Sequence, residues 1–259
     1  MAKASAARAR PLKLQSAKMS EVVARALLEH IIDADLEPGE PLPNERDAIA
    51  WLGVSRGSLR EGLRLLEAHR VVAVRPGPGG GPVVQDLDPE AYASSSTLLM
   101  QFMRVPFGEV LDTRIVFEPQ IAEVAARQRT PLQAEALQVR VGRMQKATAD
   151  DEAFQESYSE FHRILAEATQ NRVLLLTGVT FRKIWEPVHA EVRRVPEARH
   201  RTVLAHRHLA NAVAYRDSVA ASTASRQHLI EYRDYLENHQ PALLARRVEW
   251  ATESRRGTA

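Results

Sequence analysis

The stretch that decides the fold is residues 41–84, PLPNERDAIAWLGVSRGSLREGLRLLEAHRVVAVRPGPGGGPVV. Asn44 is expected to cap a short helix, because its side-chain oxygen can accept from the free backbone N–H groups of a first turn. Gly53 supplies a turn, since glycine readily adopts φ > 0. Ser55 is expected to cap a second helix. This order predicts a helix-turn-helix, whose second helix can enter a DNA major groove.

The second of these helices has two chemically different faces. An apolar stripe predicts a buried side, because its members recur at i, i+4 and i+7: Leu59, Leu63 and Leu66. A basic ridge is predicted on another face, because its members recur every four residues: Arg56, Arg60 and Arg64. Gly62 lies between two of the leucines and would let an earlier helix approach closely.

A two-stranded wing is expected to follow. Residues 71–74 and 83–84 are valine-rich and favour strands, whereas residues 75–82 are rich in Gly and Pro and favour a turn. Residues 79–81 are all glycine, so no side chain would prevent the tip from approaching a minor groove. The arginines alone would fit an ordinary solvated helix face. Cap, turn, ridge and wing together favour DNA binding.

At these residues the chain resembles the GntR family of bacterial winged helix-turn-helix repressors. The resemblance rests on Leu42-Pro43, Arg46, Leu52-Gly53-Val54-Ser55-Arg56, Leu59-Arg60-Glu61, Leu63, Leu66-Glu67 and Val83-Val84. It implies a homodimer that binds a palindromic operator in double-stranded DNA. The residues expected to contact DNA are Arg46, Ser55, Arg56, Ser58, Arg60, Gly79 and Gly80. Gly57 stands where the family usually has threonine, which removes a hydroxyl that could bind phosphate.

Composition excludes several other classes of protein. The 259 residues are 44% hydrophobic and 26% charged, which is ordinary for a globular chain of two domains. No cysteine is present, so disulfides and thiolate metal sites are excluded. No apolar run approaches the roughly 18 residues that a transmembrane helix needs. We therefore expect no membrane partner, and the resemblance implies a cytoplasmic bacterial protein that is nucleoid-associated when bound to DNA.

Four segments follow from the patterns along the chain. Residues 1–18 are rich in Lys, Arg, Ala and Ser and are expected to form a flexible basic arm. Residues 19–85 should form the winged helix-turn-helix, with a first helix over 19–34. Residues 90–240 show helical periodicity and predict an antiparallel helical bundle, and residues 241–259 a tail or helix extension. The predicted fold class is mainly α, with β structure only in the wing.

The C-terminal part resembles the FCD ligand-binding domain of the FadR subgroup of GntR regulators. The matching residues are Arg114-Ile115-Val116-Phe117-Glu118-Pro119, Ala125-Ala126, Phe161-His162, Asn171, His206, Ala212 and His228-Leu229. The resemblance implies an all-helical domain that binds an effector. Together the two resemblances cover nearly the whole chain.

Three histidines, His162, His206 and His228, lie on three different predicted helices. The resemblance implies a divalent metal at these positions, and imidazole suits Zn, Ni and similar ions. The usual fourth ligand is an aspartate four residues before the first histidine, but here that residue is Tyr158. A phenol is a poorer ligand than a carboxylate. Either the three histidines hold the metal with water or an effector carboxylate, or they are buried groups hydrogen-bonded within a metal-free bundle.

Arg114 is the main candidate for binding an effector. Its guanidinium can bind a carboxylate through two charge-assisted hydrogen bonds, and the resemblance places it near the effector pocket, which implies a small organic acid. A salt bridge with Glu118, four residues on, is an equal alternative. Tyr158 and Asn211 are further candidates; Asn211 follows His206 by about one turn and is expected to face the cavity.

The predicted function is a DNA-binding transcriptional regulator of the repressor type, whose operator binding responds to a small acidic metabolite, either with or without the help of a metal; an activator is not excluded by the sequence. An alternative is an effector-free dimeric DNA-binding protein that uses its helical part only to dimerise. A metal hydrolase would need a carboxylate base, and the sequence places none at a suitable spacing around His162. We therefore expect no enzymatic activity.

Overall fold

The computed structural model describes residues 14–77, 80–86, 89–192 and 195–250. Within these residues the chain forms eleven helices and one antiparallel pair of strands, which confirms the mainly α fold. The chain divides into two compact units, Met1–Asp88 and Pro89–Ala259. No helix in the described ranges combines the length and the apolar character needed to span a bilayer.

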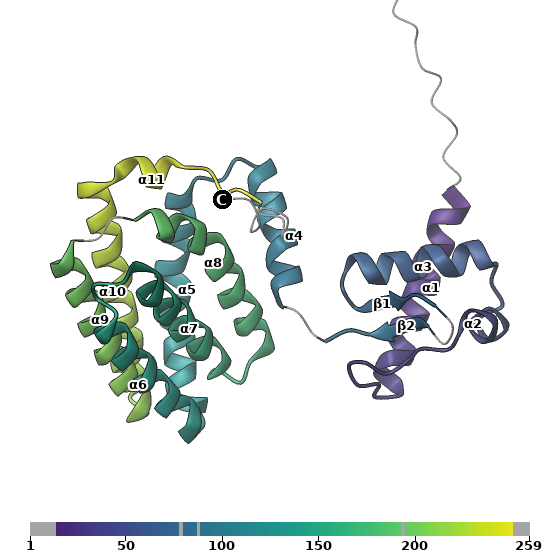
Figure 1. Ribbon diagram of the computed structural model, residues 1–259, viewed down its shortest axis with the longest axis horizontal. Helices are drawn as coiled ribbons and strands as arrows, with labels where there is room; N and C mark the ends of the chain where they lie inside the picture. The colour runs from purple at the N-terminus through teal and green to yellow at the C-terminus, as the bar shows by residue number, and fades with distance from the viewer. Residues whose placement is uncertain (1–13, 78–79, 87–88, 193–194, 251–259) are drawn as a thin grey trace, which may run out of the picture. The chain divides into compact units, whose positions relative to one another are not determined.

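The first unit contains three helices and the two strands (Figure 1). They are α1 (Leu14–Asp33), α2 (Glu45–Leu52), α3 (Arg56–Ala68), β1 (Val72–Arg75) and β2 (Gly81–Val84). α1 begins within the predicted basic arm, so the first helix is longer at its N-terminus than its sequence pattern indicated. The rest of the arm, residues 1–13, lies outside the described residues.

The helix ends in this unit are set by the expected capping groups. Asn44 caps α2, because its Oδ1 accepts from the backbone N–H of Asp47 at 3.0 Å. Gly53 ends α2 with φ of 65°, in the left-handed region that glycine tolerates. Ser55 caps α3 by accepting from the N–H of Ser58 at 3.1 Å. These local bonds fix the turn between α2 and α3 and confirm the predicted helix-turn-helix.

α3 packs against α1 through the predicted apolar stripe. Leu59 and Leu66 are buried together with α1 side chains such as Val23 and Leu27. Gly62 lies at the contact, where an added Cβ would stand 2.6 Å from Val23 Cγ1. That distance is shorter than any van der Waals contact, so only glycine lets the two helices come this close.

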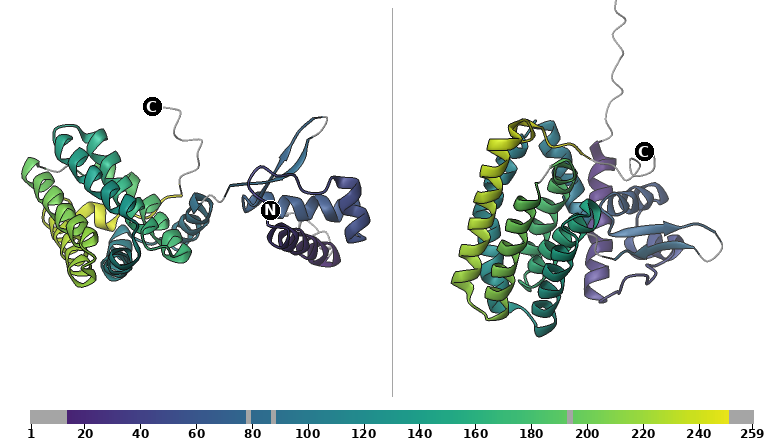
Figure 2. Two further views of the ribbon diagram at one scale, coloured as in Figure 1. Left: turned by 90° about the horizontal axis from the view of Figure 1, so that it is seen from below. Right: turned by 60° about the vertical axis from the view of Figure 1, so that its left-hand side comes forward.

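β1 and β2 form the predicted wing. They pair antiparallel, with Val72 opposite Val84 and Arg75 opposite Gly81. Figure 2 shows the hairpin projecting from the helices of its own unit. Val72 and Val84 are buried at its base and join the core of α1 and α3, so the wing is anchored where it leaves the helices.

The second unit is a bundle of helices, most of which run side by side (Figures 1 and 2). They are α4 (Pro89–Phe102), α5 (Phe107–Gln128), α6 (Pro131–Lys146), α7 (Asp151–Glu167), α8 (Arg172–Glu191), α9 (Pro196–Ala214), α10 (Ser218–His239) and the short α11 (Pro241–Ala245). α5 contacts α7, α8, α9, α10 and α11, so it is the central helix of the bundle.

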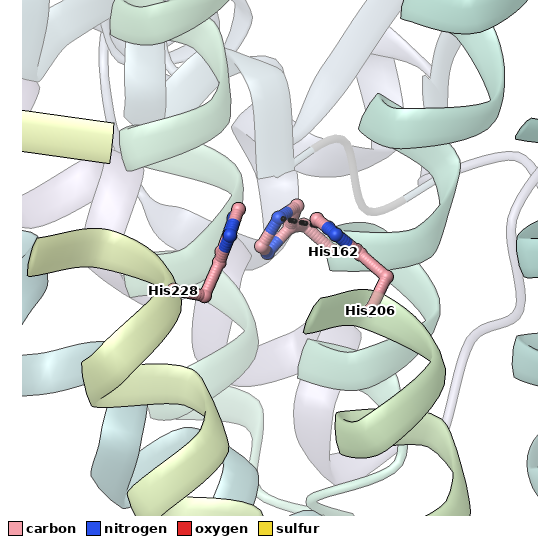
Figure 3. A group of neighbouring side chains, drawn as sticks. All are labelled: His162, His206 and His228. Atoms are coloured by element: carbon pink, nitrogen blue, oxygen red, sulfur yellow. Dashed lines mark hydrogen bonds between the residues drawn. The ribbon is translucent and has the colours of Figure 1, made fainter. Parts of the chain in front are cut away.

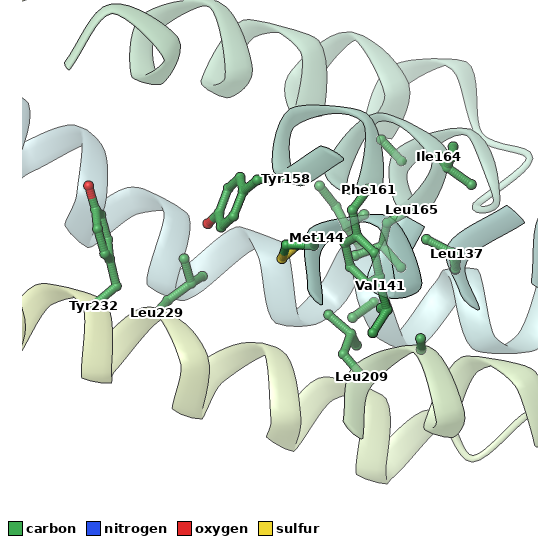
Figure 4. Close-up of a cluster of buried hydrophobic side chains, with 14 of the residues drawn as sticks. Leu137, Val141, Met144, Tyr158, Phe161, Ile164, Leu165, Leu209, Leu229 and Tyr232 are labelled. Atoms are coloured by element: carbon green, nitrogen blue, oxygen red, sulfur yellow. The ribbon is translucent and has the colours of Figure 1, made fainter. Parts of the chain in front are cut away.

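The bundle core combines aliphatic and aromatic side chains from helices far apart in the sequence (Figure 4). Side chains with 0% exposure include Leu137, Met144, Phe161 and Leu229. Burying each large apolar side chain stabilises the fold by about 1.5–3 kcal/mol. The polar groups described below are therefore held in a closely packed, apolar surrounding.

Candidate functional site

The first unit presents a basic face on α3. Arg56 and Arg60 lie one turn apart, with side chains 69% and 59% exposed. Arg46 is exposed on α2. The Oγ atoms of Ser55 and Ser58 lie 3.0 Å apart at the N-terminus of α3. Exposed guanidinium groups and hydroxyls at a helix N-terminus are the donors that proteins use to contact phosphates and base edges.

A single carboxylate organises the two α3 arginines. Glu45, the first residue of α2, places Oε1 2.6 Å from Arg56 Nε and Oε2 2.9 Å from Arg60 Nε. Glu45 was not among the residues that the sequence singled out. The only signal was its position one residue after a helix cap, which gave no reason to expect contacts across the turn.

The wing closes one side of a groove of about 480 Å³ in this unit. Glu45, Arg60 and Arg64 line it from the helices, and Gly80 from the wing. At Gly80 an added Cβ would lie 2.2 Å from the carbonyl oxygen of Arg75, so no side chain fits there. Gly79, the other predicted wing contact, lies outside the described residues.

In the second unit, the three predicted histidines converge from separate helices (Figure 3). His162 comes from α7, His206 from α9 and His228 from α10. One nitrogen from each ring lies within 4.8 Å of the other two. His206 is 1% and His228 5% exposed. Three imidazole nitrogens gathered at this spacing, away from water, are a ligand set that suits a divalent transition metal.

The neighbour of His206 fixes which of its nitrogens carries the proton. His206 Nδ1 lies 2.8 Å from the carbonyl oxygen of Thr202, which only accepts, so the proton belongs on Nδ1. His162 Nδ1 lies 3.4 Å from Glu118 Oε2, but the two atoms do not form a hydrogen bond. His206 Nε2, left as an acceptor, lies 3.2 Å from His162 Nε2, and the two nitrogens form a hydrogen bond when His162 carries its proton on Nε2. If the His162 proton moves to Nδ1, both Nε2 lone pairs can bind a cation, so the ligand set fits a metal.

The surroundings of His162 keep its ring in the neutral form. Burial, and then the charges of His206, Arg114 and His228, lower the pKa of His162 well below its ordinary value of 6.5. The ring is therefore neutral near pH 7, as a metal ligand must be.

Arg114 and Glu118 form a buried ion pair beside the histidines. Arg114 Nε donates to Glu118 Oε1 at 2.5 Å, and the two side chains are 2% and 8% exposed. Burial by itself lowers the pKa of Arg114, but the charge of Glu118, its hydrogen bond and the nearby Tyr158 and Tyr232 together outweigh this, so the net pKa lies above its ordinary value. The guanidinium also lies over Trp185, 4.8 Å from the ring centroid. Arg114 is therefore a buried cation whose charge is balanced by Glu118.

Each member of this pair keeps one polar atom unsatisfied. Among the described residues, Arg114 Nη1 and Glu118 Oε2 have no hydrogen-bond partner although both atoms are buried. Buried polar atoms without a hydrogen bond are rare and mark a strained or ligand-binding site. Glu118 is thus both the ion-pair partner of Arg114 and the carboxylate that faces His162.

Tyr158 occupies the place where the resemblance predicts an aspartate. Its hydroxyl lies 3.1 Å from His228 Nε2, and its ring stacks on Trp185 with centroids 4.5 Å apart. Tyr158 is 1% exposed. A phenol oxygen, supplied one helical turn before His162, therefore lies beside the nitrogen cluster.

A small cavity of about 40 Å³ adjoins this cluster. His228, Thr202 and Tyr232 line its inner side, and Arg201 and Glu231 are among its other lining residues. This volume holds only a few water molecules, since one needs about 10–15 Å³ measured this way. A metabolite would need side chains to move before it could enter.

Comparison with known protein families decides the identity. A family model described as bacterial regulatory proteins, gntR family, matches residues 19–80, and the FCD domain model matches residues 109–231. The chain belongs to the GntR family. It is an HTH-type DNA-binding transcriptional regulator with an FCD domain, not an enzyme, as the sequence predicted.

Several relatives resemble this GntR regulator over most of its length. It is 29% identical to the transcriptional repressor NanR of Cronobacter sakazakii, over 82% of this chain and 83% of that protein. It is 29% identical to the regulator LutR of Bacillus subtilis, over 81% of this chain and 97% of that protein. An HTH-type regulator of Mycobacterium tuberculosis is 34% identical, but the match spans 61% of this chain and 64% of that protein. A solved structure, Streptococcus agalactiae GntR, shares the fold with a TM-score of 0.70 and 24% identity, over 83% of this chain and 99% of that one.

One predicted FCD residue lies apart from the others. Asn211 is exposed on α9, where its Oδ1 accepts from Gln138 Nε2 at 2.9 Å. It follows His206 by five residues, which at 3.6 residues per turn places it roughly 140° around the helix from that histidine. The expectation that Asn211 faces the cavity is therefore corrected. Glu118, by contrast, was considered only as a partner for Arg114, and its second contact with His162 could not be inferred from spacing.

Proposed function

We propose that this GntR regulator is a repressor that binds a palindromic operator as a homodimer. Arg46, Arg56 and Arg60 would contact bases or phosphates, and the wing would follow the adjacent minor groove. The observation that carries the proposal is the pair of exposed arginines at the N-terminal end of α3, the part of a recognition helix that contacts base edges. A repressor role is supported by the similarity to NanR.

An exposed apolar face on α4 supports the homodimer. Leu99 and Phe102 on α4 are 63% and 86% exposed, and Met103, directly after the helix, is 72% exposed. Exposed apolar side chains gathered in this way are typical of a protein–protein interface. We propose that a second copy of the chain covers it, which would place two DNA-binding units on one operator.

Replacing Phe102 by glutamate is expected to weaken the dimer at least tenfold, because a charge would then be buried in the interface. Analytical ultracentrifugation across a concentration series measures the change. Val219, 74% exposed on α10, offers a matched control, and Val219→Glu should leave the association unchanged. Equal association of Phe102→Glu and the wild type would contradict the assignment of this face.

A divalent metal of the Zn or Ni type is the cofactor that the FCD domain would hold. His162, His206 and His228 would bind it, and Tyr158 lies beside them in the position of the usual aspartate. The proton that His206 keeps on Nδ1 supports this assignment, because its Nε2 then faces His162 Nε2 as a lone-pair donor. When bound, the metal supplies an electrophilic centre that can accept a carboxylate oxygen of an effector.

Metal-stripped protein is expected to melt at a higher temperature when Zn²⁺ or Ni²⁺ is added. A ligand at 100 times its Kd stabilises the folded state by about 2.7 kcal/mol. The shift should vanish in His206→Ala and persist in His208→Ala, since His208 is exposed on the same helix two residues away. A similar response of both variants would exclude the three-histidine site.

The effector is proposed to be a small organic acid that binds near Arg114. Arg114 Nη1, which has no hydrogen-bond partner among the described residues, is a buried cationic donor for a carboxylate. The adjoining cavity of about 40 Å³ is far smaller than the roughly 300–1,000 Å³ of most ligand sites. Binding would therefore select an opened state of the bundle, and that differential affinity is what can alter operator binding.

The same small cavity favours an alternative, an effector-free dimeric DNA-binding protein. In that case Glu118 satisfies Arg114 permanently and the bundle serves only dimerisation. Thermal shifts of the metal-loaded protein with a panel of hydroxy-, keto- and dicarboxylic acids separate the two. Stabilisation by one acid class supports a sensor, whereas no response from any of them supports the effector-free protein.

A further inference from the structure

We propose that Glu45 is a positioning residue for sequence recognition: by bridging Arg56 and Arg60 it fixes how the two arginines present their donors to DNA. This inference rests on the proposed DNA-binding role of α3. It assigns a specificity role to an acidic side chain in a surface that otherwise attracts phosphate.

The geometry gives each arginine its own carboxylate oxygen. Oε1 of Glu45 accepts from Arg56 Nε at 2.6 Å, and Oε2 accepts from Arg60 Nε at 2.9 Å. Glu45 begins α2, directly after the Asn44 cap, and its position is fixed by that helix end. One carboxylate, on a backbone set by the helix end, therefore contacts two long side chains that stand one turn apart on the neighbouring helix.

Both contacts use the Nε atoms, which leaves the outer ends of the guanidinium groups for DNA. Guanine O6 and N7, or two phosphate oxygens, accept two parallel bonds from the donors of an arginine. Long side chains lose rotamer freedom when they bind, and a guanidinium that is already oriented loses less. Glu45 thus prepares Arg56 and Arg60 for such contacts before DNA arrives.

Stability does not account for this arrangement. The side chains of Arg56, Arg60 and Glu45 are 69%, 59% and 35% exposed, and exposed ion pairs contribute little to folding. An acid at a DNA-binding surface also repels phosphates and so weakens sequence-independent binding. Glu45 is therefore expected to raise the ratio of specific to non-specific affinity, and not the affinity for DNA in general.

Glu61 provides a matched control within the same unit. It lies on α3 and pairs with Arg64 at 2.6 Å, with both side chains exposed. Glu61→Gln changes the net charge by the same amount as Glu45→Gln, but it leaves the bridge between Arg56 and Arg60 intact. A difference between the two variants therefore reports the bridge and not the charge.

The test uses the full chain. Wild-type protein first selects its preferred duplex from a random pool, and fluorescence anisotropy at one salt concentration then measures affinity for that duplex and for a scrambled one. The specificity ratio should fall about tenfold in Glu45→Gln, consistent with loss of a well-formed arginine–base contact. The specificity ratio should change less than about twofold in Glu61→Gln, because the bridge from Glu45 to Arg56 and Arg60 is unaffected.

A second variant separates geometry from charge. Glu45→Asp keeps the charge and the acidic first turn of α2, so it should fold normally, but its shorter side chain cannot reach both arginines. Its specificity ratio is expected to fall as well. The inference is overturned if Glu45→Gln and Glu61→Gln behave alike, or if Glu45→Asp retains the wild-type ratio. Failure of the wild type to select any sequence would instead overturn the proposed function, and this inference with it.

Discussion

Replacing Arg56 and Arg60 together by alanine is expected to abolish specific operator binding while the chain remains folded. Each well-placed arginine–base contact discriminates by about 1–3 kcal/mol, so loss of two should weaken operator binding by roughly 30-fold to 10⁴-fold. The loss would be deepened by Glu45, which would keep its negative charge without either partner. Both arginines are exposed, so folding should change little.

Anisotropy titrations at several salt concentrations measure this effect. If both arginines neutralise phosphates, the slope of log K against log salt should decrease in magnitude by about 2. Arg127→Ala with Arg143→Ala removes the same charge from exposed positions of the FCD domain and should leave operator binding intact. Retained specific binding by the Arg56/Arg60 variant would remove α3 from the DNA interface.

Replacing Glu118 by leucine is expected to destabilise the FCD domain by about 3–5 kcal/mol, because it leaves the Arg114 cation buried without a counter-ion. Arg114 is 2% exposed and cannot reach water without unpacking the bundle. The partner of His162 Nδ1 is lost at the same time. Urea unfolding of the metal-free protein, followed by circular dichroism, measures the loss.

The same helix supplies the control for this variant. Arg127 and Glu123 on α5 have the same residue types, with the glutamate again four residues from the arginine, but they are 53% and 28% exposed. Glu123→Leu should therefore cost at most about 1 kcal/mol. Adding Arg114→Met to Glu118→Leu should recover most of the lost stability, since two apolar side chains can replace a buried pair. If both single variants lose the same stability, the Arg114–Glu118 pair is not isolated from water.

Many features of the first unit could be predicted from the sequence, because its helix ends and turns depend on nearby residues. Asn44, Gly53 and Ser55 cap or turn the chain through bonds to residues at most four positions away. Gly62 was recognised as a close-approach position because it interrupts a leucine stripe. Such features depend on residues a few positions apart in the chain, and this spacing can be read directly from the sequence.

The histidine cluster was predictable for a different reason. Spacing alone placed His162, His206 and His228 on separate helices and left a metal-free bundle open, so the family resemblance was what brought them together. Asn211 shows the limit of counting turns, since five residues after His206 is too far around α9 to share its face.

What the sequence by itself determined is the mainly α fold and the helix-turn-helix with its wing; the residues that it names as contacts for DNA or a metal stay predictions. Only the tertiary structure decided that Glu45 bridges Arg56 and Arg60, and that Glu118 joins Arg114 to His162. The reason is physical: helix periodicity follows from residues three or four apart, whereas these contacts depend on how separate helices pack. A carboxylate on another helix carries no local signal of the cation or imidazole that it will meet.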